Sequence, residues 1–360
     1  MKFNAIADVT QLDQFDEKID VRSPAEFALD HIVGAINLPV LDDIERAQVG
    51  TRYKQTSSFE AKKVGAALVA RNIARHLETT LADRPKNWQP LIYCWRGGNR
   101  SASLAHVLRQ IGWNAQALDG GYKAYRRFVI DELNRLPSTL QLRIICGPTG
   151  SGKSRLLQQI AKRGGQVLDL EELAAHRGSV LGNLPDRSQP SQKHFESTLW
   201  DAMRRFSTYR SVFVEAESVK IGRLRVPETL IARMWDSPCL SLSLPMGARV
   251  EFLTQEYAHF LQDLPDLAAK LRGLHSLYGR EKIERWLSLA SGRRWQELVE
   301  QLLEDHYDPA YRRSTLSHYP TLNRAPTFRA DRIDAASLEV LATEILQSTE
   351  NEKRIDAVAA

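Results

Sequence analysis

Residues 94–100 read Cys-Trp-Arg-Gly-Gly-Asn-Arg, and this stretch decides the first half of the fold. It lies between an apolar run typical of a strand, Leu-Ile-Tyr, and a helix-forming stretch, Ser-Ala-Ser-Leu-Ala. A strand, a glycine-containing loop and a helix in this order direct backbone N–H groups and the positive end of the helix dipole toward one point. The pattern therefore predicts an anion-binding loop with Cys94 at its base.

The chemistry that this loop predicts is covalent catalysis by Cys94, with Arg96 and Arg100 as charged partners. Cationic surroundings and a helix N-terminus lower the pKa of a cysteine from ~8.5 to about 3.5–7.5, so that the thiolate dominates at neutral pH. The remaining residues of the active-site loop are expected to supply its wall: Trp95, Gly97, Gly98 and Asn99.

Segments on both sides of the loop resemble the rhodanese (sulfurtransferase) domain. Upstream, residues 19–27 read Ile-Asp-Val-Arg-Ser-Pro-Ala-Glu-Phe and residues 31–39 read His-Ile-Val-Gly-Ala-Ile-Asn-Leu-Pro. Downstream, residues 118–125 read Leu-Asp-Gly-Gly-Tyr-Lys-Ala-Tyr. The resemblance covers roughly residues 8–130 and implies an α/β rhodanese-like domain.

The loop departs from the common rhodanese pattern by one residue. Arg100 stands six residues after Cys94, which gives the Cys-x5-Arg spacing of rhodanese-like phosphatases. A wider ring of N–H donors suits a tetrahedral group of the phosphate type better than a thiosulfate sulfur. Loop length alone leaves two reactions open, the hydrolysis of a phosphate ester and the capture of a heavier atom.

A second motif marks the other half of the chain. Residues 147–154, Gly-Pro-Thr-Gly-Ser-Gly-Lys-Ser, match the P-loop pattern G-x4-G-K-[ST] in full. A short apolar strand precedes them, and apolar residues at helical spacing follow. Such a loop wraps a diphosphate, with Lys153 neutralising it and Ser154 available to Mg²⁺. The predicted phosphate-binding residues are Gly147, Gly150, Gly152, Lys153 and Ser154.

A nucleotide hydrolase also needs an acid at the end of a neighbouring strand. Glu215 ends the apolar run 211–215 and is the candidate metal ligand or acid. A Glu in place of the usual Asp, with no clear water-positioning residue, argues against a rapid ATPase. We expect no metal beyond Mg²⁺ at Ser154 and no tightly bound cofactor.

Composition sets further limits. The chain has 360 residues, which suggests two domains, and 26% of them are charged. No apolar run reaches ~18 residues, and the start does not resemble a signal peptide. Three distant cysteines form no disulfide framework, so we expect a cytoplasmic protein without membrane contact. A net charge of +5, with paired basic residues near aromatic rings, gives moderate support to RNA as a partner.

The predicted fold class is α/β. Residues 1–136 form a rhodanese-like domain, and residues 137–348 form a P-loop NTPase-like parallel-sheet domain with a helical C-terminal part. Residues 349–360 are expected to be a flexible tail. Residues 41–90 are a long insertion that we expect to serve substrate binding. Strands of the second sheet are predicted at 141–146, 166–170, 211–215 and 240–244.

A rhodanese domain with this lengthened loop, fused to a P-loop domain, closely resembles the tRNA 2-selenouridine synthase family. The similarity extends through Glu215-Ala-Glu-Ser and the stretches 49–55 and 62–69. The resemblance implies a transferase that acts on the wobble uridine of tRNA, already carrying 2-thiouridine. It implies two steps: S-geranylation from geranyl diphosphate, and then replacement of the geranylated sulfur by selenium from selenophosphate.

The residues fit this scheme. Cys94 would take selenium as a perselenide, while Arg96, Arg100 and the loop amides stabilise the departing phosphate. Lys153 in the P-loop, with or without Mg²⁺ on Ser154, would ease the loss of pyrophosphate from geranyl diphosphate. ATP at the P-loop stays open as an alternative ligand.

Other classes of function compete with this interpretation. One is a Cys-x5-Arg phosphatase or a sulfurtransferase coupled to an ATP-using P-loop domain. Others are a P-loop kinase with an inert rhodanese module and a non-catalytic RNA-binding adaptor. The fusion to a P-loop domain argues against a simple phosphatase, and the intact cysteine loop argues against the kinase. A non-catalytic adaptor would keep its tRNA affinity in both C94S and K153A.

Overall fold

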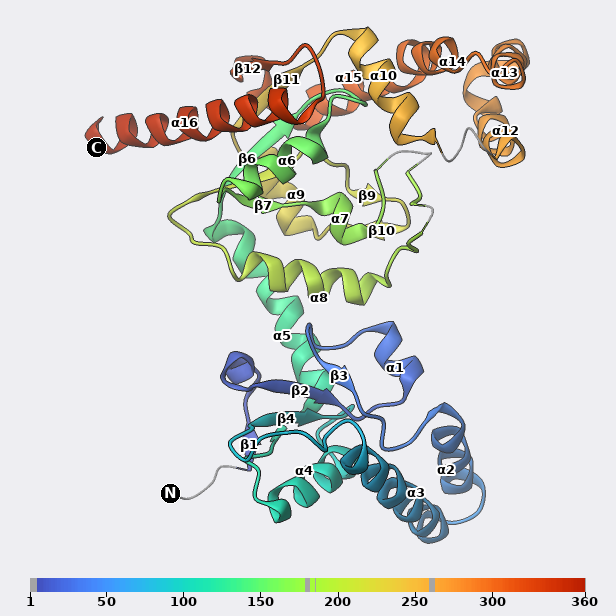
Figure 1. Ribbon diagram of the computed structural model, residues 1–360, viewed down its shortest axis with the longest axis vertical. Helices are drawn as coiled ribbons and strands as arrows, with labels where there is room; N and C mark the ends of the chain where they lie inside the picture. Colours follow the sequence, from blue (N-terminus) through green and yellow to red (C-terminus); the bar gives the residue numbers. More distant parts are fainter. Residues whose placement is uncertain (1–4, 179–181, 185, 259–262, 360) are drawn as a thin grey trace. The chain divides into compact units, whose positions relative to one another are not determined.

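The computed structural model describes residues 5–178, 182–184, 186–258 and 263–359 (Figure 1). The chain divides into two compact units. The first comprises residues 1–133 and 190–201, and the second comprises residues 134–189 and 202–360. Across the described ranges, no helix combines the length and apolar character needed to cross a membrane.

The first unit is built on a five-stranded parallel sheet in the order β1-β5-β4-β2-β3. The central strand β4 is buried along its whole length, because helices cover both faces of a parallel sheet. The strands are β1 (Ile6–Ala7), β2 (Glu17–Asp20), β3 (Ile36–Asn37), β4 (Pro90–Tyr93) and β5 (Gln116–Leu118). The helices are η1 (Val9–Gln14), α1 (Pro24–Leu29), α2 (Asp43–Gln55), α3 (Ser58–Glu78), α4 (Asn99–Ile111), α5 (Gly121–Arg135) and α8 (Gln192–Met203).

The second unit holds another five-stranded parallel sheet, in the order β12-β11-β6-β8-β7. Its strands are β6 (Gln141–Cys146), β7 (Gln166–Leu168), β8 (Ser211–Glu215), β11 (Cys239–Ser243) and β12 (Thr327–Arg329). The four predicted strands are present, and β12 is an addition. β7 ends two residues earlier than expected, because the side chain of Asp169 caps the next helix by accepting from the N–H of Glu172. A short antiparallel pair, β9 (Lys220–Ile221) and β10 (Leu224–Arg225), accompanies the sheet.

Helices surround this second sheet and continue into a helical part, as the sequence predicts (Figure 1). The α-helices are α6 (Lys153–Lys162), α7 (Leu170–Ala174), α9 (Glu228–Trp235), α10 (Met246–Glu256), α12 (Leu264–Gly273), α13 (His275–Ser291), α14 (Trp295–Leu302), α15 (Asp308–His318) and α16 (Ala335–Ala359). Shorter turns are η2 (Leu136–Thr139), η3 (Leu303–Tyr307) and η4 (Pro320–Arg324). The helical part has an apolar core of its own around Trp286.

The structure differs from the sequence-based division at two places. Residues 190–201 belong to the first unit, where Phe195 and Leu199 of α8 are fully buried and Ser197 donates to Asp30 (3.2 Å). At the C-terminus, α16 runs to Ala359 through the stretch expected to be a flexible tail. Thr349 is buried there and donates to the carbonyl of Ile345 (2.7 Å), which continues the helix.

Candidate active sites

Cys94 lies where β4 ends, at the base of a loop that leads into α4. The side chain is 3% exposed. Its Sγ accepts two hydrogen bonds, one from the N–H of Gly98 and one from the hydroxyl of Ser101, both at 3.3 Å. Two donors aimed at one sulfur favour its anionic form over the thiol. Ser101 is a functional residue that the sequence analysis did not single out.

The pKa of Cys94 lies below its ordinary value. Burial, the strongest influence, raises this pKa because a buried site disfavours a charged sulfur. Hydrogen bonds from the side chain and N–H of Ser101 and from the N–H of Arg96, together with the charge of Arg100, outweigh the burial. The shift has the direction that the loop sequence predicts.

The two arginines of the loop have different roles. Arg100 is half-buried and forms an ion pair with Glu26 (3.0 Å), so its charge is fixed close to the sulfur. The side chain of Arg96 is exposed, and no ion pair joins it to the rest of the described chain. Arg96 therefore acts on Cys94 through its backbone N–H, and Arg100 supplies the fixed charge.

A segment distant in the sequence, residues 120–123, holds the cysteine loop in place. The N–H of Tyr122 donates to the carbonyl of Cys94 (2.8 Å), and the N–H of Lys123 donates to that of Trp95 (3.1 Å). Gly121 has φ +57°, and a Cβ at this position would collide with the Cys94 carbonyl oxygen. Residues 118–125, which the sequence analysis identified only by their resemblance to rhodanese, therefore contain the segment that clamps the cysteine loop.

Buried polar groups support this clamp from below. The guanidinium of Arg22 pairs with Asp20 (2.5 Å) and lies 4.0 Å from the centre of the Tyr122 ring. The hydroxyl of Tyr122 donates to Asp30 (2.7 Å), and Arg22 donates to the carbonyl of the same residue (2.7 Å). These hydrogen bonds fix the position of Tyr122 and hence of the cysteine loop that it contacts.

The P-loop connects β6 to α6, as the motif predicts. Lys153 extends over the loop and donates to the carbonyl of Gly147 (2.8 Å). The hydroxyl of Ser154 donates to Glu171 (2.6 Å). Arg249 of α10 is buried; it donates twice to the carbonyl of Thr149 (2.8 and 2.9 Å) and pairs with Asp308 (2.6 Å). The helical part of the unit therefore braces the P-loop.

Carboxylates gather beside Lys153. Glu215 is fully buried; one of its oxygens accepts from the N–H of Glu171 (2.9 Å), while the other has no hydrogen-bond partner in the described structure. Burial, then the charge of Asp169, raises the pKa of Glu215 well above its ordinary value. Burial and the charge of Glu171 raise the pKa of Glu217 to about 8, and burial raises that of Asp169 to about 6.

The sequence analysis identified Glu215 and gave no role to the other acids. The signal was present, since Asp169 and Glu171 follow the carboxyl end of β7 and Glu217 follows that of β8. The oxygens of Ser154 and Glu171 are the kind of donor that Mg²⁺ prefers. However, no group of three acidic, His or Cys side chains among the described residues is placed to hold a metal ion. Mg²⁺ at Ser154 therefore stays a prediction.

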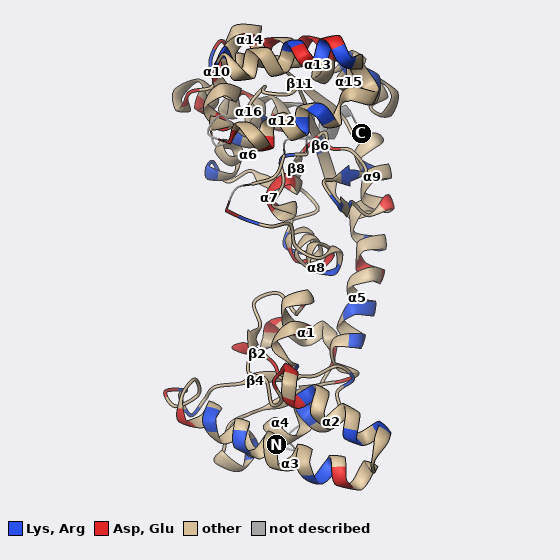
Figure 2. Ribbon diagram, turned by 90° about the vertical axis from the view of Figure 1, so that its right-hand side faces the viewer, with Lys and Arg blue, Asp and Glu red and all other residues tan. Residues whose placement is uncertain are grey.

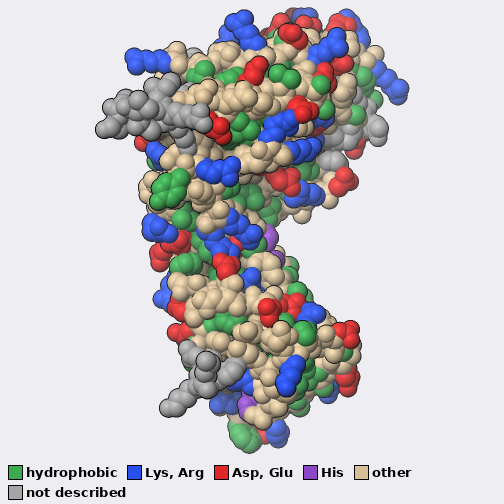
Figure 3. All heavy atoms as spheres, turned by 60° about the vertical axis from the view of Figure 1, so that its left-hand side comes forward, with side chains coloured by type: hydrophobic (Ala, Val, Ile, Leu, Met, Phe, Trp, Pro, Cys, Tyr) green, Lys and Arg blue, Asp and Glu red, His purple; other side chains and the backbone are tan. Residues whose placement is uncertain are grey.

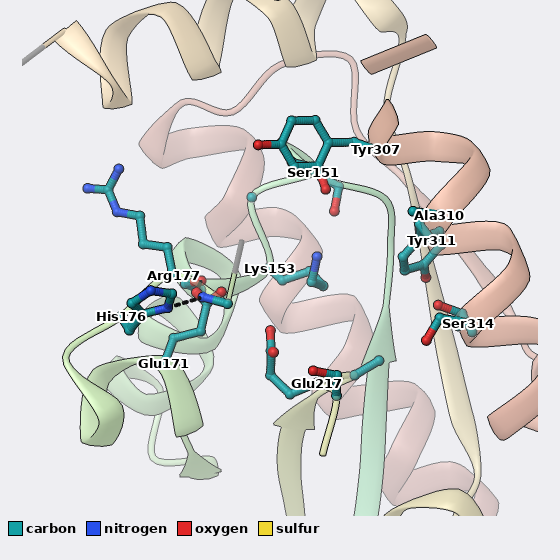
Figure 4. Close-up of a pocket in the computed structure, with 18 of the residues that line it drawn as sticks. Ser151, Lys153, Glu171, His176, Arg177, Glu217, Tyr307, Ala310, Tyr311 and Ser314 are labelled. Carbon is teal, nitrogen blue, oxygen red and sulfur yellow. Dashed lines mark hydrogen bonds between the residues drawn. The ribbon is translucent and has the colours of Figure 1, made fainter. Parts of the chain in front are cut away.

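A cavity of about 990 Å³ opens beside the P-loop. In Figure 4, Lys153 lies between the carboxylates of Glu171 and Glu217 on one side and the side chains of α15, Tyr311 and Ser314, on the other. Charged and aromatic side chains both line the cavity. The aromatic residues that line it are Trp235, Phe252, Tyr257, Tyr307, Tyr311 and Tyr319.

Comparison with known families agrees with this arrangement. Residues 7–128 match the model of the rhodanese-like domain, and residues 140–280 match the model of the tRNA 2-selenouridine synthase AAA domain. The predicted order of a rhodanese-like domain followed by a P-loop domain is thereby confirmed.

Three similar proteins share one name, tRNA 2-selenouridine synthase. A tRNA 2-selenouridine synthase of Alcanivorax borkumensis is 34% identical over 325 residues, covering 81% of this chain and 88% of the relative. That of Bdellovibrio bacteriovorus is 31% identical over 87% of this chain and 93% of the relative. That of Nitrosomonas europaea is 37% identical over 66% of this chain and 63% of the relative.

Proposed function

This chain belongs to the tRNA 2-selenouridine synthase family, and from that premise we propose that it converts 2-thiouridine of tRNA into 2-selenouridine at the wobble position. The enzyme is a transferase. Its proposed co-substrates are geranyl diphosphate and selenophosphate. One observation carries the proposal: a single chain holds two strand–loop–helix turns, one built around a thiol of lowered pKa and one beside a cavity that aromatic and charged side chains line.

We assign geranyl transfer to the P-loop. The diphosphate would lie on the loop amides and Lys153, and the branched apolar chain would lie against aromatic side chains that line the cavity. The thiouridine sulfur attacks C1 of the geranyl group, and the new C–S bond forms as the C–O bond breaks. The electron pair leaves with pyrophosphate, whose charge Lys153 and the loop amides stabilise, and the uracil ring loses its N3 proton.

We assign selenium transfer to the cysteine loop. Selenophosphate is a tetrahedral phosphate that carries selenium, and the loop amides with Arg100 suit its oxygens. In the proposed perselenide route, an S–Se bond forms at Cys94 and the Se–P bond breaks. Release of the phosphorus as phosphate requires a two-electron acceptor of the disulfide class. Thiols return the two electrons when selenium passes to C2 of the uracil, and geranyl thiol leaves.

The Cys-x5-Arg spacing also supports a route without an oxidant. Here the Cys94 thiolate attacks phosphorus, an S–P bond forms, and selenide leaves with the electron pair of the Se–P bond. Water then hydrolyses the phosphocysteine, while selenide attacks C2 and expels geranyl thiol. Both routes start from the same thiolate, and both end in phosphate and 2-selenouridine.

To test the function, geranyl diphosphate and selenophosphate are each added separately to thiolated tRNA with the enzyme. The tRNA nucleosides are then analysed by mass spectrometry. We expect geranyl diphosphate alone to give S-geranylated uridine with the wild type and with C94S, but not with K153A. We expect 2-selenouridine only from the wild type with both donors. The assignment would be overturned if C94S made normal amounts of 2-selenouridine. It would also be overturned if the reaction required ATP and not geranyl diphosphate.

The intermediate on Cys94 can be identified in the same protein. Intact-protein mass spectrometry after incubation with selenophosphate and a disulfide detects a perselenide by the isotope pattern of selenium, which a phosphocysteine lacks. Release of phosphate from an aryl phosphate in a Cys94-dependent way, with no change in the tRNA, would favour the phosphatase alternative.

A further inference from the structure

The molecule carries no single large basic patch on the face seen in Figure 3, where Lys and Arg side chains lie among Asp and Glu. The net charge of +5 therefore does not locate a surface for RNA. A more local feature does, in the insertion between β3 and β4 of the first unit, whose second helix α3 packs Ile73 into the core of the sheet. This feature is the helical hairpin of α2 and α3, residues 43–78.

The helix α2 has no buried residue, and it packs against α3, where Gly65 lets Val49 approach closely. Large apolar side chains of the hairpin are exposed: Ile44 by 79%, Tyr53 by 58% and Phe59 by 69%. A polar helix with exposed rings contributes little to the stability of its own core. Its sequence is better explained by contact with a partner.

The hairpin has more basic than acidic side chains. Residues 43–78 contain seven Lys or Arg and four acids, and Glu60 is the one acid between residues 46 and 75. Lys and Arg recur along both helices in Figure 2. Four of the basic side chains are exposed and form no ion pair with another described residue: Arg52, Lys54, Lys62 and Arg71. Exposed cations and exposed rings on one short hairpin match a partner made of phosphates and stackable bases.

The hairpin is also joined to the cysteine loop. Glu26 accepts from Arg100 of that loop and from Arg46 of α2, both at 3.0 Å. Asp43, the first residue of α2, accepts from the N–H of Ala25 (3.2 Å). The N-terminal turn of α2 is therefore fixed to the same carboxylate that fixes the charge beside Cys94.

We propose that the α2–α3 hairpin is the surface on which the enzyme docks the tRNA arm that carries the target uridine. The inference rests on the proposed function and names the site of its RNA substrate. Arg52, Lys54 and Lys62 bind phosphates, and the ring of Tyr53 stacks on an unpaired base. The chain of Arg46, Glu26 and Arg100 sets this surface beside the thiolate that delivers selenium.

The test compares two triple variants in binding to thiolated tRNA over a range of salt. The hairpin variant is R52A/K54A/K62A, and the matched control K86A/R127A/K162A removes three exposed basic residues elsewhere. We expect the hairpin variant to bind tRNA about 10-fold or more weakly and to lower the salt slope by about 2–3, since each lost phosphate contact lowers it by about one. We expect the control to stay within about twofold of the wild type.

Tyr53 tests the stacking part separately. We expect Y53A to weaken tRNA binding about 10-fold and Y53F to restore it, because stacking needs the ring and not the hydroxyl. Modification of Cys94 by selenophosphate without tRNA, as a phosphocysteine or, with a disulfide present, as a perselenide, is expected to stay normal in every hairpin variant. Wild-type tRNA affinity in R52A/K54A/K62A, or equal weakening in the control, overturns the docking surface, whereas absence of both Cys94 adducts in the wild type overturns the proposed function.

Discussion

The cysteine loop of the first unit and the P-loop of the second share one backbone design and differ in their charges. Each loop joins a buried parallel strand, β4 or β6, to the N-terminus of a helix. At the cysteine loop, the pKa of Cys94 is lowered, and Arg100 stands beside it. At the P-loop, the pKa values of Glu215, Glu217 and Asp169 are raised, because buried acids crowd one another.

The difference fits the two kinds of chemistry that we propose. At the cysteine loop, neighbouring groups donate hydrogen bonds and positive charge that keep the sulfur ionised. At the P-loop, we propose that Lys153 stabilises the departing diphosphate. The two loops should therefore respond to mutation and pH in opposite and separable ways.

The largest expected effect comes from breaking the clamp of the cysteine loop. G121A adds a Cβ that collides with the Cys94 carbonyl at φ +57°, so we expect the rate of selenium transfer to fall at least ~100-fold, from misplacement of the thiolate. Geranylation at the P-loop should persist. The matched control is G34A, since Gly34 has φ +77° and nothing within 4 Å. We expect it to lose about 1 kcal/mol of stability and keep selenation.

A second substitution, R249M, should destabilise the P-loop without changing the reactivity of Cys94. R249M leaves Asp308 without its partner and frees the Thr149 carbonyl, so we expect about 3–5 kcal/mol of lost stability in the second unit. Chemical denaturation should show this loss, and geranylation should fall about 10-fold. R249M/D308L should recover much of the stability, because it leaves no unpaired charge. Slower alkylation of Cys94 in R249M would contradict the separation of the two sites.

Removing the Ser101 hydroxyl tests which hydrogen bonds stabilise the Cys94 thiolate. S101A deletes the hydroxyl that donates to Sγ, so the pKa of Cys94 should rise and its alkylation near neutral pH should slow about 10-fold. Peptide mapping must follow each cysteine separately, because the pKa of Cys239 is itself lowered to about 7, chiefly by its contact with Cys146. A pH–rate profile for Cys94 unchanged in S101A would show that the hydroxyl has no such role.

The smallest expected effect is a pH dependence of stability from the acids of the P-loop. The pKa of Glu217 rises from 4.5 to about 8 in the folded protein, which therefore favours the protonated form. The stabilisation is complete below pH ~4.5 and is lost as the pH rises through about 8. We expect the melting temperature of the wild type to fall over this range and that of E217Q to fall less. Parallel curves would contradict the raised pKa.

Local patterns predicted the parts of the molecule that local sequence encodes. Cys94 and the motif 147–154 occupy strand–loop–helix turns because each is one continuous segment. The Arg249–Asp308 pair was not predicted, since a buried ion pair between residues so far apart leaves no periodic signal. The placement of α8 on the first unit was missed for a similar reason. An apolar helix face predicts that the helix is buried, but not which surface it packs against.

The most direct test of two separate sites uses tRNA that already carries S-geranylated thiouridine. This substrate bypasses the P-loop step, so K153A supplied with selenophosphate is predicted to make 2-selenouridine at close to the wild-type rate. C94S is predicted to make none. Failure of K153A on this substrate, or selenation by C94S, would contradict the assignment of the two reactions to two loops.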